Sequence, residues 1–253
     1  MANKYDSFIE LTPGYESVVD ISSDSRDADF WSHYIVNDDM VTAVKLLASS
    51  LRPDDPNEDV WHYWIKGSYG TGKTYSAIVI KHLLQDDYSI VENFLNKNKL
   101  FIDVKDKFLA ARKKARYFVK FRSGECKQLD TSNKFLFQIE QSVRDILKEN
   151  GFSYTGRNSL VDSVRSTVKD FKPKLAQDFE DGDYPEYWGT YDTFDSFYDA
   201  VQAGDITACS NAQEILQSMN IGLATDLETF KAWIKDVYAG NEELSKSGIF
   251  IIW

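Results

Sequence analysis

Gly67-Ser68-Tyr69-Gly70-Thr71-Gly72-Lys73-Thr74 is the stretch from which we begin to predict the fold of this chain. It matches the phosphate-binding loop pattern G-x-x-x-x-G-K-[ST] at every fixed position. Glycines adopt the positive φ values that bring backbone N–H groups close to phosphate oxygens, and a following helix directs its positive end at the same anion. The pattern predicts a nucleotide site made by all eight residues. Lys73 would contact the β- and γ-phosphates and the Thr74 hydroxyl would bind Mg²⁺.

The residues on either side of this loop fit a strand before it and a helix after it. Residues 60–65 (VWHYWI) are β-prone and of strand length. Residues 75–84 place Ala77, Ile80 or Lys81, and Leu84 at helical spacing. Strand, glycine loop and helix follow one another in P-loop proteins. The alternative is a glycine-rich turn between a strand and a helix that binds nothing.

Two further segments predict strands. Residues 116–122 are β-prone, and Ile249-Phe250-Ile251-Ile252-Trp253 is an uninterrupted apolar run, typical of a strand buried on both faces of a parallel sheet. We therefore expect an α/β fold, the parallel-sheet core of a P-loop NTPase. In P-loop ATPases such a run is followed by the Walker B acids. We expect these acids after Trp253, so that the chain is an N-terminal fragment with an incomplete core and unknown catalytic residues.

Helical patterns fill most of the remaining sequence. Asn37 is expected to cap a helix that starts at Asp38, and Thr225-x-x-Glu228 has the pattern of a capping box. The organisation that we expect has four parts: a lead-in at residues 1–36, the first part of an ATPase core at 37–150, a helical acidic and aromatic insertion at 151–247, and the start of the Walker B strand at 248–253.

Charge is divided unevenly along the chain, whose formal net charge is −11. Residues 175–230 contain twelve Asp and Glu but no Lys or Arg, and their aromatic content argues against disorder. This region is either a solvated acidic lobe or a partner-binding surface, such as a nucleic-acid mimic. Residues 97–127 are rich in Lys and Arg, which fits either a patch for nucleic acid or an acidic partner, or a solvated helix face.

Several classes of protein are excluded by the sequence. No run of 18 apolar residues is long enough to span a membrane, and the N-terminus lacks the pattern of a secretory signal. Cys126 and Cys209 stand alone, and His33, His62 and His82 lack metal-ligand spacing. We expect a cytoplasmic protein without a membrane partner. Its overall acidity argues against a broad nucleic-acid-binding face.

The layout from residue 37 to residue 253 resembles the start of the large P-loop ATPases of bacterial phage-defence systems, most closely the ATPase component of BREX systems, which are AAA+-like (ASCE) proteins. The resemblance rests on the loop at 67–74 and on the order of capped helix, basic helix, strand, helical insertion and apolar terminal strand. It implies ATP and Mg²⁺ as cofactors, with Lys73 as the phosphate lysine and Thr74 as the Mg²⁺ ligand. It also implies other defence-system proteins as partners, DNA as a partner of the parent protein, and a homo-oligomer of the full-length protein.

Three functions fit these observations. The first is an ATP-driven motor or switch in an anti-phage defence complex, in which a Glu beyond this chain activates water and the chain alone hydrolyses ATP poorly. The second is a P-loop kinase acting on small molecules, which the long acidic insertion fits less well. The third is a STAND-type regulatory or binding module that holds ATP as a structural ligand. The residues after Trp253 would distinguish them, since Asp-Glu there favours hydrolysis.

Overall fold

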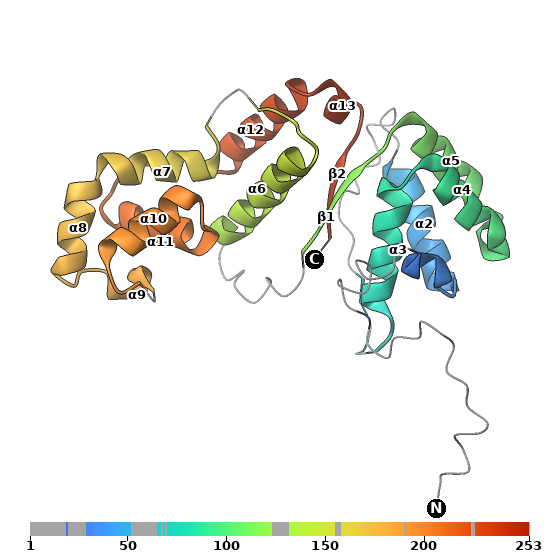
Figure 1. The fold of residues 1–253 in the computed structure, drawn as a ribbon, viewed down its shortest axis with the longest axis horizontal. Coiled ribbons are helices and arrows are strands. Elements are labelled where there is room, and N and C mark those ends of the chain that lie inside the picture. The colour runs from blue at the N-terminus through green and yellow to red at the C-terminus, as the bar shows by residue number, and fades with distance from the viewer. Residues whose placement is uncertain are drawn as a thin grey trace, which may run out of the picture. The chain divides into compact units, whose positions relative to one another are not determined.

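The structure, a computed structural model, describes Val19 and residues 29–51, 65–66, 68, 70–122, 132–154, 158–189, 191–223 and 226–252. The chain divides into two compact units, unit 1 (Met1–Arg116) and unit 2 (Tyr117–Trp253). Figure 1 shows the elements of both. The domain boundaries expected at residues 36, 150 and 247 stay predictions.

Unit 1 is helical wherever its elements are described. Its elements are η1 (Phe30–His33), α2 (Asp38–Ser50), α3 (Lys73–Gln85), α4 (Tyr88–Lys97), η2 (Lys99–Phe101) and α5 (Lys105–Lys114). α5 packs against both α2 and α4, and η1 packs against α3. Val44, Ile78, Leu83, Leu95 and Phe108 are fully buried in this unit. Burial of such apolar side chains is the main stabilising contribution to the fold.

Asn37 caps α2, as the sequence predicted. Its side chain accepts a hydrogen bond from the backbone N–H of Met40 at 3.0 Å. Asp38 and Asp39 occupy the first turn, where the helix dipole favours negative charge. Local sequence therefore determines where this helix begins.

Arg112 of α5 holds the C-terminal end of α3. Its side chain is only 4% exposed and donates hydrogen bonds to the backbone carbonyls of Leu83, at 2.8 Å, and of Asp86. Carbonyls at the end of a helix lack partners within the helix, so a buried guanidinium that binds them stabilises the helix end. This member of the basic stretch is therefore structural and not part of a surface patch.

The described residues of unit 2 form packed helices and one pair of strands. Its elements are β1 (Phe118–Phe121), α6 (Ser132–Glu149), α7 (Leu160–Asp170), α8 (Lys172–Glu180), α9 (Pro185–Trp188), α10 (Phe194–Ala203), α11 (Ile206–Ser218), α12 (Leu227–Ala239), α13 (Glu242–Ser245) and β2 (Ile249–Ile252). α11 packs against α6, α7, α9 and α10 (Figure 1). Its residues Ala208, Ile215 and Leu216 are fully buried, which makes α11 the centre of the core of this unit.

α12 begins one residue later than a capping box at Thr225 would place it. The N-cap is Asp226, whose side chain accepts a hydrogen bond from the Thr229 N–H at 2.7 Å. Thr225 itself lies outside the described residues. Aspartate is at least as good an N-cap as threonine, so the neighbouring residue takes the position.

The two strands pair in parallel, with Phe118 opposite Ile249 and Phe121 opposite Ile252. The strand predictions at residues 116–122 and 249–253 are thus confirmed, at shorter lengths. The prediction that the terminal strand is buried on both faces is wrong, because all four residues of β2 are only half-buried. β2 has a single strand neighbour, β1, among the described residues.

The predicted α/β fold, the parallel-sheet core of a P-loop NTPase of AAA+/ASCE type, is wrong. The described residues are mostly helical, and their sheet has two strands. Most apolar side chains of unit 2 are buried between helices, so helix packing replaces the expected central sheet. Of the strand predicted at 60–65, residues 60–64 lie outside the described part and Ile65 belongs to no strand. None of the described helices combines the length and apolar character that crossing a bilayer requires.

We predict that Gly204→Ala destabilises unit 2 by about 1 kcal/mol, because an L-residue is strained in the left-handed conformation. Gly204 ends α10 with φ +83°, and a Cβ there would lie 3.5 Å from Val161. Urea denaturation followed by tryptophan fluorescence measures the change. Gly222→Ala is the matched control, since a Cβ there meets nothing within 4 Å. Equal stability of the two variants would contradict the prediction.

Candidate functional site

The glycine loop leads directly into α3, which begins at Lys73 and is 13 residues long. Gly70 and Gly72 have φ values of +80° and +78°. A Cβ at either position would meet no atom within 4 Å, so the backbone conformation, and not lack of space, is what requires glycine. The loop therefore has the left-handed turns that the sequence pattern predicted.

Six of the eight predicted site residues are described: Ser68, Gly70, Thr71, Gly72, Lys73 and Thr74. Gly67 and Tyr69 lie outside the described residues. Lys73 is half-buried and the other five are exposed, so a ligand in solution can reach the loop.

Two side chains of the loop converge on one backbone oxygen. The Lys73 Nζ donates to the Ser68 carbonyl at 2.6 Å, and the Thr71 Oγ1 donates to the same carbonyl at 2.9 Å. The first turn of α3 is thereby tied back to the start of the loop. The Lys73 ammonium group therefore lies beside the start of the loop, next to the place that an anion bound by the loop would occupy.

The N-terminal end of α3 adds partial positive charge to the loop. Ser76 N–H donates to the Gly72 carbonyl at 2.9 Å, and the N–H groups of a first helical turn point outward along the helix axis. Gly72, the N-cap, has no side chain to accept from them. The end of the helix macrodipole carries roughly +0.5 of an elementary charge, which favours an anion at this place.

Aromatic residues of η1 and of its C-cap position hold the first turn of α3 in place. The Tyr75 ring stacks on Phe30 with centroids 4.6 Å apart, and its hydroxyl donates to the Phe30 carbonyl at 2.7 Å. The Tyr34 hydroxyl lies 2.9 Å from the Ser76 Oγ. The first turn is therefore fixed before any ligand arrives, which lowers the entropy lost on binding.

Thr74 is the residue of this loop that the sequence pattern predicts as a metal ligand. Within the described ranges no group of three or more His, Cys, Asp or Glu side chains could hold a metal ion. Thr74 is exposed at the second position of α3 and can offer a hydroxyl. Its role as a Mg²⁺ ligand stays a prediction, which fits the preference of Mg²⁺ for phosphate oxygens and water.

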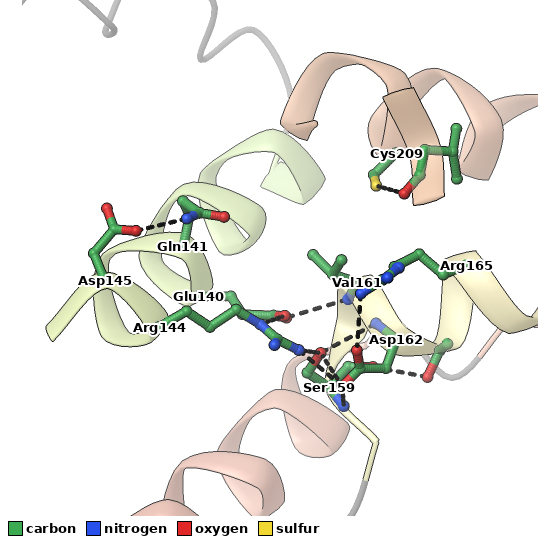
Figure 2. Close-up of polar contacts among 11 residues, drawn as sticks. Glu140, Gln141, Arg144, Asp145, Ser159, Val161, Asp162, Arg165 and Cys209 are labelled. Carbon is green, nitrogen blue, oxygen red and sulfur yellow. Dashed lines mark hydrogen bonds and ion pairs between the residues drawn. The ribbon is translucent and has the colours of Figure 1, made fainter. Parts of the chain in front are cut away.

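A second polar cluster, not predicted from the sequence, lies between α6 and the start of α7 (Figure 2). Arg144 donates to Glu140 at 2.8 Å and to Asp162 at 2.8 Å. Its guanidinium also donates to the Ser159 hydroxyl, and the other Glu140 oxygen accepts from the Val161 N–H at 3.3 Å. The Glu140 side chain is completely buried, so this carboxylate depends on its partners within the protein.

The charged groups of this cluster favour one another's ionised forms, and the cluster thereby stabilises the fold. Burial disfavours the ionised Asp162 carboxylate, but Arg144 and hydrogen bonds from Ser159 outweigh it and hold its pKa below the usual value. Burial also opposes the charge of Arg144, but Glu140 and Asp162 outweigh it and raise the pKa of the guanidinium. Ser159 and Asp162 form the capping box of α7. The S-x-x-D pattern before an apolar run could have revealed the cap.

Cys209 is not a nucleophile. It is fully buried, and its Sγ lies 3.7 Å from the Val201 carbonyl oxygen (Figure 2). Burial, reinforced by the charge of Asp205, raises the pKa of the Cys209 thiol to about 12. The thiol therefore stays protonated near neutral pH and lacks the thiolate that such chemistry needs. Cys126 lies outside the described residues.

Some charged side chains of the basic stretch and of the acidic region have partners within the protein, and whether either region binds a partner stays a prediction. Lys120 pairs with Glu149 at 2.6 Å and Arg122 pairs with Asp145 at 2.8 Å, so these cations bind carboxylates of α6. In the acidic region, Asp178 is 2% exposed and pairs with Lys174. The rest of that region follows the expected pattern of short helices with most carboxylates exposed.

Comparisons with known proteins identify no relative. No family model matches the chain, and no curated protein or solved structure matches it either. The resemblance to phage-defence ATPases therefore gains no support from them.

We predict that Arg144→Met destabilises unit 2 by about 3 kcal/mol, because it leaves the Glu140 carboxylate buried without its charged partner. Urea denaturation followed by tryptophan fluorescence measures the loss. The double variant Arg144→Met, Glu140→Leu is the control, and it should recover at least half of the lost stability. If the double variant is as unstable as the single one, the buried charge is not the cause.

We also predict a pH dependence from Asp162. Because its pKa is lower in the folded chain than the usual 3.8, it stabilises the fold above that pH. The contribution is lost as pH falls below 3.8 through the folded pKa. Asp162→Asn should therefore lower stability at pH 7 and reduce the fall in stability between pH 5 and pH 2. Thermal unfolding across this range measures both, and an unchanged acid transition in the variant would refute the assignment.

Proposed function

We propose that the loop at residues 67–74, through Ser68 and residues 70–74, binds the phosphates of ATP together with Mg²⁺. The observation that carries the proposal is the pair of left-handed glycines, Gly70 and Gly72, in the three residues before Lys73 at the start of α3. A glycine turn, a helix N-terminus and a lysine ammonium group converge there. Each of the three favours a phosphate group.

The proposed roles follow from the positions of the groups. Backbone N–H groups of the loop and of the first turn of α3 would contact phosphate oxygens. Lys73 would exchange its contact with the neutral Ser68 carbonyl for one with a negatively charged phosphate oxygen, in which both donor and acceptor are ionised. Thr74 would place its hydroxyl on the Mg²⁺ that the phosphates hold.

The proposal concerns binding and not turnover. A loop and a helix N-terminus are sufficient to hold phosphate, so binding does not require the α/β core that the described residues lack. No contact among the described residues favours the motor, the kinase or the regulatory module over the other two. The defence role, its protein and DNA partners, and the cytoplasmic location stay predictions.

Nucleotide titration tests the proposal. ATP, ADP and GTP would each be titrated with Mg²⁺ onto the 253-residue chain and followed by calorimetry. We predict that Lys73→Ala weakens ATP binding at least about tenfold, since a hydrogen bond to a charged group contributes about 1.5–3 kcal/mol. Lys45→Ala, which removes an exposed cation from α2 of the same unit, should leave affinity unchanged.

Two outcomes would contradict the proposal. One is the absence of ATP binding by a chain whose helical circular dichroism shows that it is folded. The other is equal affinity of the wild-type chain and Lys73→Ala. If ATP does bind and Lys73→Ala weakens it, the order of affinity among ATP, ADP and GTP shows whether the γ-phosphate and the base are recognised.

A further inference from the structure

We infer that Thr71 is a positioning residue of the phosphate loop, an inference that rests on the proposed function. Thr71 Oγ1 donates to the Ser68 carbonyl at 2.9 Å, the same oxygen to which Lys73 Nζ donates at 2.6 Å. The Ser68 carbonyl therefore accepts hydrogen bonds from two donors. The charged Lys73 ammonium group would be attracted to a bound phosphate, whereas the neutral Thr71 hydroxyl can stay on the carbonyl.

The two donors have different fates when phosphate binds. In the proposed complex the Lys73 ammonium group moves from the Ser68 carbonyl to the phosphate, which would leave the carbonyl without its charged donor. A carbonyl oxygen carries partial negative charge, so one facing the loop interior would repel the phosphate. Thr71 keeps a hydrogen bond to this oxygen after the lysine has moved, which both satisfies the carbonyl and fixes its direction.

The surroundings of Thr71 suit this role. It lies between Gly70 and Gly72, which have φ of +80° and +78° and no side chains. The only side chain that these three consecutive residues provide is that of threonine, whose branched Cβ restricts χ1. The direction of its hydroxyl is therefore better defined than that of an unbranched side chain. A hydrogen bond to residue i−3 also stabilises a turn, so the test must separate positioning from local stability.

The test compares Thr71→Val, which keeps the shape and removes the hydroxyl, with Thr71→Ser, which keeps the hydroxyl. Affinity for ATP with Mg²⁺ is measured by calorimetry on the full chain, with the thermal midpoint of the nucleotide-free chain recorded in parallel. We expect Thr71→Val to bind about three- to tenfold more weakly, the range of one neutral hydrogen bond. Thr71→Ser should bind within about twofold of wild type, and both thermal midpoints should be unchanged. Thr42→Val, at an exposed threonine of α2, is the matched control.

The outcomes separate this inference from the proposed function. Loss of affinity in Lys73→Ala with wild-type affinity in Thr71→Val overturns the inference and leaves the phosphate site in place. Unchanged affinity in Lys73→Ala overturns the phosphate site itself. The inference also fails if Thr71→Ser binds as weakly as Thr71→Val, or if Thr71→Val lowers the thermal midpoint of the nucleotide-free chain, because the residue then acts through loop stability.

Discussion

Gly72 adopts φ +78° at the N-cap of α3, and the geometry of the candidate site depends on this single backbone conformation. A residue with a Cβ would be strained there, which would shift the start of the helix or open the loop. With Gly72 in place, Lys73 and Thr74 become the first two residues of α3, and the Lys73 ammonium group reaches the Ser68 carbonyl. The stacking of Tyr75 on Phe30 then holds the same turn from outside.

Local features of the fold could be predicted from sequence because they depend on neighbouring residues. Asn37 caps α2 as expected, and the loop pattern placed positive φ at glycines. The fold class could not be predicted from sequence, because a strand pattern shows that residues are apolar but not which elements cover them. β2 is fully apolar and yet half-buried beside one neighbour, whereas most of the core in unit 2 comes from helix faces.

Some polar contacts could also be predicted from the sequence, whereas others depend on how distant segments pack. The capping box of Ser159 and Asp162 spans three residues and is visible in the sequence, whereas the ion pair of Arg144 and Asp162 joins two helices. At the candidate site, the eight residues could be named from the motif. The hydrogen bonds from both Lys73 and Thr71 to the Ser68 carbonyl could not be predicted, because they depend on the conformation of the loop.

The proposed function requires that phosphate binds at the start of α3. The most direct test is to titrate ATP with Mg²⁺ into the ¹⁵N-labelled chain and follow the amide signals by NMR. We predict saturable shifts at Gly72, Lys73 and Thr74, absent from Lys73→Ala, while the amides of buried α11 stay unchanged. Saturable binding that leaves the three loop amides unmoved, or that shifts them equally in Lys73→Ala, would contradict it.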